Sequence, residues 1–283
     1  TQFSIWLFLI KPIYSETHMP LHTSIATLIG ILLSTLFIAA AGYIINDYFD
    51  IKTDAINRPN KLLLENTIDR RKAILLHLLL TLVGVLIGVI IALQHDNILL
   101  VGFQIISSLL LWFYSTRYKQ SYLTGNILVA ALTSICILMF YWYEPQLAIH
   151  KNAQTVLFTT ALFAFTLTWM RELVKDMEDL KGDTIAGCKT MPIAWGLQTT
   201  KVYVAVWLMV LILVLIIIQL YAIPFGWWIA IIYCIVAIIS PLVYVLFNLK
   251  QAFSRADFNR LSNLVKLAML MGILSMGFFY FLL

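Results

Sequence analysis

Nine apolar runs dominate this sequence and restrict the architectures that it can adopt. All but the short first run approach the roughly 20 residues that a helix needs to cross a bilayer. They lie at approximately 1 to 14, 23 to 45, 73 to 94, 97 to 114, 123 to 143, 153 to 174, 202 to 221, 226 to 247 and 262 to 283. Of the 283 residues, 61% are hydrophobic and only 12% are charged. We therefore expect an all-α, polytopic membrane protein with about nine transmembrane helices.

The basic residues are distributed asymmetrically between the loops. Of the 19 lysines and arginines, all except Lys11 and Lys151 fall in the loops after the second, fourth, sixth and eighth runs, or at the adjoining helix ends. Because cytoplasmic loops are enriched in lysine and arginine, these four loops are expected to face the cytoplasm. The net charge of +5 follows from this topology and gives no indication of nucleic-acid binding.

The start of the chain and its cysteines carry two further expectations. Thr1 opens the chain inside an apolar run, so we expect a truncated N-terminus. We also expect residues 1 to 283 to form a single transmembrane domain. Cys136, Cys188 and Cys234 lie far apart without paired spacing, which argues against a disulfide or zinc framework.

Two acidic motifs stand out, "NDYFDIKTD" at residues 46 to 54 and "KDMEDLKGD" at 175 to 183. Each places three aspartates at offsets 0, 3 and 7, namely Asp47, Asp50 and Asp54, then Asp176, Asp179 and Asp183. At about 100° per residue these offsets fall within roughly 60° of one helix face. Carboxylates so arranged repel one another unless a cation lies between them, and oxygen-only ligands favour Mg²⁺ or Ca²⁺ over zinc.

Both motifs begin where an even-numbered run ends, so they are expected at the cytoplasmic mouth of the helices. The two loops that carry them are the longest in the chain and contain breaks such as Pro59, Gly182 and Gly187. Loops of this kind can form a helical cap over the mouth. The matched spacing of the two motifs also hints at an internal duplication.

Amide and basic side chains accompany the motifs and could contact phosphate oxygens or the aspartates themselves. The alternative for the basic residues is a role in membrane topology alone. The candidates from position are Asn46, Arg58, Lys61, Lys119, Arg171 and Lys175.

Two acidic faces opposed across a cavity could hold one or two Mg²⁺ ions, and these could bind a diphosphate that the aspartates alone would repel. A hydrocarbon attached to the diphosphate could then lie among the helices. Breaking the C–O bond of an allylic diphosphate requires stabilisation of the leaving group, which Mg²⁺, lysine and arginine provide. A nucleophile would capture the allylic cation in a pocket shielded from water.

The sequence resembles the UbiA-type intramembrane prenyltransferases over nearly its whole length. "NDYFDIKTDAINRP" is similar to their NDxxDxxxD signature, and "RELVKDMEDLKGDTIAGCKTMPIAWG" resembles the digeranylgeranylglyceryl phosphate synthase-like branch. "YSTRYK" and the pair Gly125 and Asn126 extend the resemblance. One departure is "NKLLLEN" after Pro59, where the family often has R-P-L-P-S-G, so Lys61 replaces an arginine.

The resemblance implies about nine helices around a central cavity with cytoplasmic cap loops. It implies that the six aspartates are catalytic and bind Mg²⁺ through an isoprenoid diphosphate. Asn46, Arg58, Lys119 and Lys175 are expected near that diphosphate, and Lys61 and Asn126 are further candidates for substrate binding. Arg171 and Lys189 are candidates for the phosphate of an acceptor.

The expected activity is Mg²⁺-dependent prenyl transfer to a lipophilic acceptor, with a geranylgeranylglyceryl phosphate-type ether lipid as the first choice. An aromatic quinone precursor is the alternative acceptor. A divalent-cation transporter is the competing class, but no run carries a clear charge at its centre, as a transporter would require. The expected location is the cell (inner) membrane with the active site facing the cytoplasm, and the bilayer is the only expected partner beyond the substrates.

Overall fold

The computed structural model describes residues 1–17, 21–57 and 69–281, and this part of the chain is helical without strands. The first predicted run forms three short consecutive pieces, α1 (Gln2–Ile5), a π-helical turn η1 (Trp6–Ile10) and α2 (Lys11–Thr17). The long helices of the first half follow. They are α3 (Ile25–Asn57), α4 (Arg70–Gln94), α5 (Leu100–Thr116), α6 (Thr124–Leu138) and α8 (Lys151–Glu178).

Short helices connect or cap these long ones, and two further helices complete the bundle. The connecting elements are η3 (Tyr118–Gln120), α7 (Phe140–Tyr143), η4 (Pro145–Ala148), α9 (Leu180–Ile185) and α10 (Met191–Ala194). The second half contains α11 (Leu197–Ala222), η5 (Ile223–Phe225), α12 (Trp228–Tyr233), η6 (Cys234–Ile239), α13 (Ser240–Leu249), α14 (Arg255–Ser275) and η7 (Met276–Phe281). Pro241 lies at the junction of η6 and α13 inside the continuous span Trp228–Leu249, where it removes one backbone N–H donor from the helix.

Seven helical stretches in the described residues are long and apolar enough to cross a membrane, which makes this an integral membrane protein. They are Ile25–Asn57, Arg70–Gln94, Thr124–Tyr143, Lys151–Glu178, Leu197–Phe225, Trp228–Leu249 and Arg255–Phe278. Leu100–Thr116 is apolar but shorter. The all-α polytopic prediction is confirmed, whereas the count of nine spans is not, because the first and fourth runs give only short helices.

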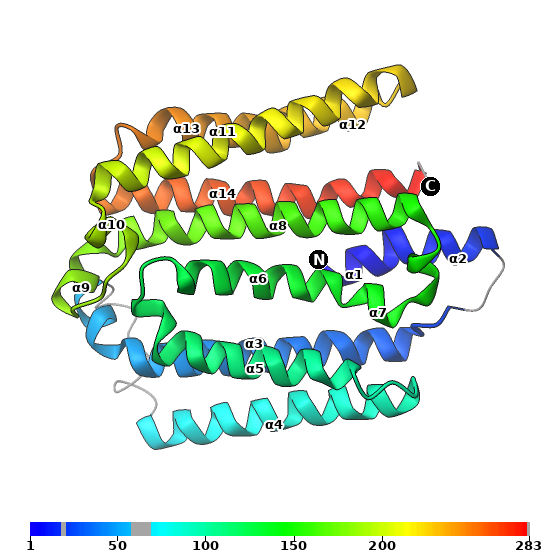
Figure 1. Cartoon of the computed structure of the whole chain (residues 1–283), viewed down its shortest axis with the longest axis horizontal. Helices are drawn as coiled ribbons and strands as arrows, with labels where there is room; N and C mark the ends of the chain where they lie inside the picture. Colours follow the sequence, from blue (N-terminus) through cyan, green and yellow to red (C-terminus); the bar gives the residue numbers. More distant parts are fainter. Residues whose placement is uncertain (18–20, 58–68, 282–283) are drawn as a thin grey trace.

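The long helices lie side by side in one bundle (Figure 1). Helix α3 packs against α4 and α5, α6 packs against α8, and α8 packs against α11 and α14. The tip of α3 with α9 and α10 forms one end of the bundle, at the left of Figure 1, and α2 and α7 lie at the other. The left end carries both acidic motifs and the cap helices.

Two large clusters of buried residues hold the bundle together. One joins α8, α11, α13 and α14, with Met170, Leu208, Leu242 and Phe258 among its members. The other fills the right-hand end of Figure 1 and joins η1, α3, α5, α7 and the start of α8. Many leucines and isoleucines remain exposed on the outside of the helices, as expected for side chains that face lipid.

Candidate active site

A cavity of about 620 Å³ contains both acidic motifs. Its walls come from α3, α5, η3, α6, α8, α9 and α14. The residues that line its charged end include Asn46, Asp47, Asp50, Asp54, Lys119, Arg171, Lys175, Asp176, Asp179 and Asp183. The structure therefore brings together two motifs that lie more than a hundred residues apart in sequence.

The first motif forms the predicted acidic face of one helix. Asp47, Asp50 and Asp54 all lie on α3, and Asp50 is almost completely buried. The Asn46 side-chain amide donates a 2.6 Å hydrogen bond to Asp50 Oδ2, and Lys119 Nζ contacts the same oxygen. Lys119 Nζ also lies 3.4 Å from Asn46 Oδ1. An aspartate, an asparagine and a lysine predicted separately thus form one hydrogen-bonded group.

Lys119 is held in place by the short η3 helix between α5 and α6. Gly125, at the start of α6, packs so tightly on η3 that a Cβ there would lie 2.7 Å from the Tyr118 carbonyl oxygen. Any side chain at Gly125 would therefore displace the backbone that carries Lys119. Burial opposes the charge on Lys119, but the Asp50 carboxylate outweighs it and raises the pKa of the lysine above its ordinary value.

The second motif is divided between two helices, so the prediction of one continuous helix face is wrong here. Helix α8 ends at Glu178, Asp179 forms the junction, and α9 begins at Leu180. The hydrogen bonds from Asp179 N to the Lys175 oxygen and from Asp183 N to the Asp179 oxygen persist, at 2.9 and 3.1 Å. The aspartates therefore keep a helical spacing across the bend, and all three line the cavity.

Asn57 joins the two motifs and was missed by the sequence analysis. Its side-chain amide donates to the Asp179 carbonyl oxygen at 3.1 Å and accepts from the Gly182 backbone N–H at 3.0 Å. A Cβ at Gly182 would overlap this side chain. Asn57 follows Asp54 by three residues, so it continues the same face of α3. That spacing is the signal by which it could have been found.

Glu172 is a second missed residue. It lines the cavity one turn before Asp176, forms an ion pair with Arg171 at 2.9 Å and lies 3.7 Å from Lys175 Nζ. Its position four residues before Asp176 continues the acidic face backwards along α8. Arg171 and Lys175 therefore already have a carboxylate partner within the chain.

Burial affects the charge of the second motif. Burial raises the pKa of the Asp183 carboxyl to about 6, and the nearby charge of Asp179 adds to this effect. The Asn126 amide donates a 2.8 Å hydrogen bond to Asp176 Oδ2. Asn126 does not itself line the cavity but lies behind Asp176 and orients it.

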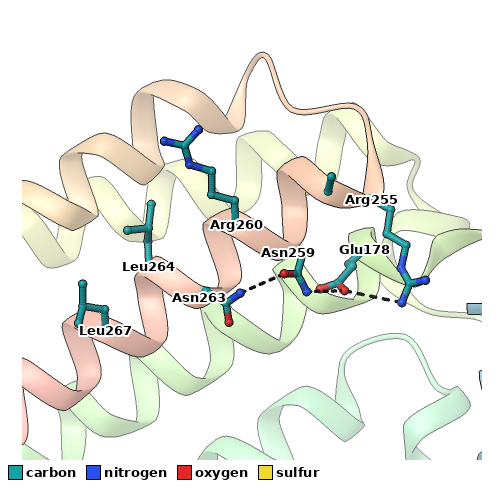
Figure 2. Close-up of a pocket in the computed structure, with 8 residues that line it drawn as sticks. Glu178, Arg255, Asn259, Arg260, Asn263, Leu264 and Leu267 are labelled. Carbon is teal, nitrogen blue, oxygen red and sulfur yellow. Dashed lines mark hydrogen bonds and ion pairs between the residues drawn. The ribbon is translucent and has the colours of Figure 1, made fainter. Parts of the chain in front are cut away.

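A network on the outer side of α8 and α14 supports the second motif from behind (Figure 2). Glu178, which the sequence analysis did not select as a site residue, accepts a 2.9 Å hydrogen bond from Asn259 and lies 3.8 Å from Arg255. The same arginine lies 3.6 Å from Asp179 Oδ1. These residues border a second, open pocket of about 860 Å³, and Glu178 is the one carboxylate among the described residues that line it. Because the acidic motifs converge on the first cavity, we assign the chemistry there.

Two predicted residues, Lys189 and Asn126, do not line the cavity. Lys189 is exposed in the loop after α9, and its backbone N–H bonds to the Gln120 oxygen at 2.8 Å. Arg58 and Lys61 lie outside the described residues.

The donor set fits magnesium bound together with phosphate. Among the described residues that line the cavity, seven carboxylates face only three basic side chains. In the same part of the chain, no group of three or more His, Cys, Asp or Glu side chains is close enough to hold a metal unaided. Mg²⁺ commonly takes one or two carboxylates and completes its shell with phosphate oxygens and water, so a diphosphate would supply the remaining ligands.

The fold and the paired acidic motifs define an intramembrane prenyltransferase. The UbiA prenyltransferase family profile matches residues 17–281, and the chain belongs to this family. The family resemblance inferred from the two motifs is thereby confirmed.

Named relatives narrow the comparison. The digeranylgeranylglyceryl phosphate synthase of Sulfurisphaera tokodaii is 35% identical over 74% of this chain and 70% of that protein. The synthase of the same name from Methanosphaera stadtmanae is 30% identical over 85% of this chain and 83% of that protein. The match to the Methanobrevibacter smithii synthase, at 32% identity, spans only 57% of that protein.

A solved structure shares the fold. It was determined in work on digeranylgeranylglyceryl phosphate synthase in membranes, and it matches with a TM-score of 0.63 at 22% identity. The alignment covers 100% of this chain and 99% of that one.

Proposed function

We propose that this protein transfers a prenyl group from an isoprenoid diphosphate to a geranylgeranylglyceryl phosphate-type ether lipid, in a reaction that requires Mg²⁺. The observation that carries the proposal is the convergence of both acidic motifs on the charged end of one cavity whose remainder is largely apolar. The names of the relatives support the choice of acceptor. An aromatic acceptor remains the alternative.

The aspartates of both motifs would hold the donor diphosphate through Mg²⁺. Bound there, Mg²⁺ would neutralise the charge that develops on the departing diphosphate. Lys119, Arg171 and Lys175 line the same end of the cavity and can donate to phosphate oxygens. Asn46 and Asn126 keep Asp50 and Asp176 oriented through their hydrogen bonds.

The apolar part of the cavity would receive the prenyl chain. Ile38, Leu111, Val129 and Leu132 line it below the charged end. Such walls exclude water, so the allylic cation would meet the acceptor hydroxyl and not a water molecule. Arg171 lines the cavity and is our candidate for the acceptor phosphate, whereas Lys189 lies outside the cavity and is not retained for this role. We also propose a single domain, in the cell membrane, with the charged end facing the cytoplasm, because the basic loops gather there.

The test is an assay of purified protein in detergent with labelled geranylgeranyl diphosphate, Mg²⁺ and two acceptors, geranylgeranylglyceryl phosphate and 4-hydroxybenzoate. We expect product with the glyceryl phosphate, and loss of it in Asp47→Ala and Asp176→Ala. Asp69→Ala is the matched control, because Asp69 lies at the same end of the bundle but is exposed and outside the cavity. Product with 4-hydroxybenzoate alone would show that the acceptor is an aromatic compound and not the ether lipid. Absence of Mg²⁺-dependent product with both acceptors would overturn the proposal.

A further inference from the structure

The cavity reaches deep into the bundle below the aspartates. On α3, lining residues run from Asp50 back to Thr35, a separation of about 22 Å at 1.5 Å per residue. On α6 and the turn that follows, Met139 lines the cavity about 20 Å along the helix from Asn126. Phe103 and Gln104 reach a similar level on α5. The deep end of the cavity is therefore formed by residues of three helices.

A polar bridge lies behind this deep end. The Gln2 side-chain amide nitrogen lies 3.1 Å from Thr35 Oγ1, 3.2 Å from Met139 Sδ and 3.3 Å from the Cys136 carbonyl oxygen. All three partners line the cavity, and Gln2 itself is buried. A carboxamide nitrogen carries two hydrogens, so these acceptors use its full capacity. The bridge connects α1, α3 and α6 across the bottom of the cavity.

The space beyond the bridge is closed by packed side chains. Ile31 on α3, Leu100 on α5 and Phe140 on α7 are all buried in the same apolar cluster as Met139. Protein interiors are packed at the density of organic crystals, so a hydrocarbon cannot extend into this cluster without displacing side chains. Displacing Met139 or Thr35 would in addition remove hydrogen-bond partners of a buried amide.

We propose that Gln2, Thr35 and Met139 form a floor that limits the donor to a prenyl chain of about four isoprene units. This inference rests on the proposed function. A carbon chain with bonds of about 1.5 Å advances about 1.25 Å per bond, so the sixteen main-chain carbons of a geranylgeranyl group span about 19 Å. The distance of about 22 Å along α3 from Asp50 to Thr35 must hold the diphosphate as well as the chain, so four units are the upper limit that the floor allows. A chain of five units would have to displace the floor.

The test compares farnesyl, geranylgeranyl and geranylfarnesyl diphosphates, of three, four and five units, as donors. The wild-type protein should prefer geranylgeranyl diphosphate. Met139→Ala and Gln2→Ala should raise kcat/KM for geranylfarnesyl relative to geranylgeranyl diphosphate by about tenfold, the order by which apolar pockets discriminate chain size. Ala39→Phe, which places a ring in the cavity above the floor, should shift the preference to farnesyl diphosphate.

Met276→Ala is the matched control. Met276 is buried in the same cluster but does not line the cavity, so its loss should lower stability without changing the preferred donor. If all three cavity variants turn over the donors but keep the wild-type preference for donor length, the proposed floor is wrong and the proposed function is unaffected.

A second measurement separates the floor from the reaction. Saturated alkyl diphosphates of the same three lengths, added with Mg²⁺, should raise the melting temperature of the wild-type protein most at four units. In Met139→Ala the largest increase should move to five units. If no donor is turned over, the proposed function is wrong. The dependence of the melting temperature on alkyl chain length still tests whether the floor limits the length of the bound chain.

Discussion

At the scale of single residues, the site balances charges that come from different helices. Asp50 and Lys119 contact each other, and Arg171 pairs with Glu172. Each basic side chain already has a carboxylate partner and can exchange it for a phosphate oxygen of similar hydrogen-bonding capacity. The charged end of the cavity is thus electrostatically prepared for a ligand that brings both phosphate and Mg²⁺.

Lys119 is expected to stabilise the leaving diphosphate. Lys119→Met should therefore lower kcat/KM about 100-fold, the usual cost of removing one donor aimed at developing charge. Lys72→Met is the control, because Lys72 is an exposed lysine at the same end of the bundle. Steady-state kinetics with the labelled donor measures the effect, and equal kcat/KM values for the two variants would contradict the role.

Asn57 is expected to matter for stability as well as for activity. Asn57→Ala removes two hydrogen bonds that join the acidic motifs and leaves the Gly182 N–H without its partner, at a cost of about 1–3 kcal/mol. Gly182→Ala should act in the same direction, because a Cβ would overlap Asn57. Both variants should have lower melting temperatures than the wild-type protein and should require more Mg²⁺ for half-maximal activity.

Gly272→Ala provides the comparison for these two variants. Nothing lies within 4 Å of a Cβ at Gly272, which lies within α14. Alanine there should leave the Mg²⁺ requirement unchanged and stabilise the helix by about 0.5–1 kcal/mol. If Gly182→Ala behaves like Gly272→Ala, then the joint between the motifs has no functional importance.

At the scale of elements, the sequence predicted the acidic faces better than the helices that carry them. The offsets of 0, 3 and 7 predicted two acidic groups, and in the structure all six aspartates line one cavity. They did not reveal the bend at Asp179, where a residue distant in sequence contributes: Asn57 on α3 bonds the Asp179 carbonyl oxygen and the Gly182 N–H. Contacts of this kind depend on tertiary packing and leave no periodic signal.

Helix α9 is expected to respond to the ligand. It carries Asp183, whose charge is disfavoured by burial and by Asp179 until a cation is present. Adding Mg²⁺ with inorganic diphosphate should therefore slow hydrogen exchange of the backbone amides at 179–187. Mg²⁺ alone should have a smaller effect, since these carboxylates do not form a metal site unaided. Equal protection with and without diphosphate would argue against joint binding.

At the scale of the whole molecule, the apolar runs predicted a helical membrane protein, and the seven spans confirm this. The runs did not predict how the first of them divides into α1, η1 and α2, or that Gln2 closes the cavity. Hydropathy records how apolar a segment is. It does not record which neighbouring helix a buried amide will meet.

The topology can be measured by labelling single cysteines in sealed vesicles. Lys189→Cys and Ile149→Cys both replace exposed loop residues, on opposite sides of the expected bilayer. A membrane-impermeant maleimide should label position 189 only from the cytoplasmic side and position 149 only from the other. Background from Cys188 should be low at pH 7.5, because burial and the charge of Asp183 raise the pKa of its thiol to about 11. Labelling of both positions from one side would contradict the assignment.

The confinement of the charged lining residues to one end of the cavity has a consequence for lipid traffic. With the floor closing the other end, a phosphate-bearing acceptor and its prenylated product would keep their headgroups at the same membrane surface throughout the reaction. The enzyme would therefore deliver every new lipid to the leaflet from which the acceptor came. Supplying the opposite leaflet would then require a separate protein that moves headgroups across the hydrocarbon core.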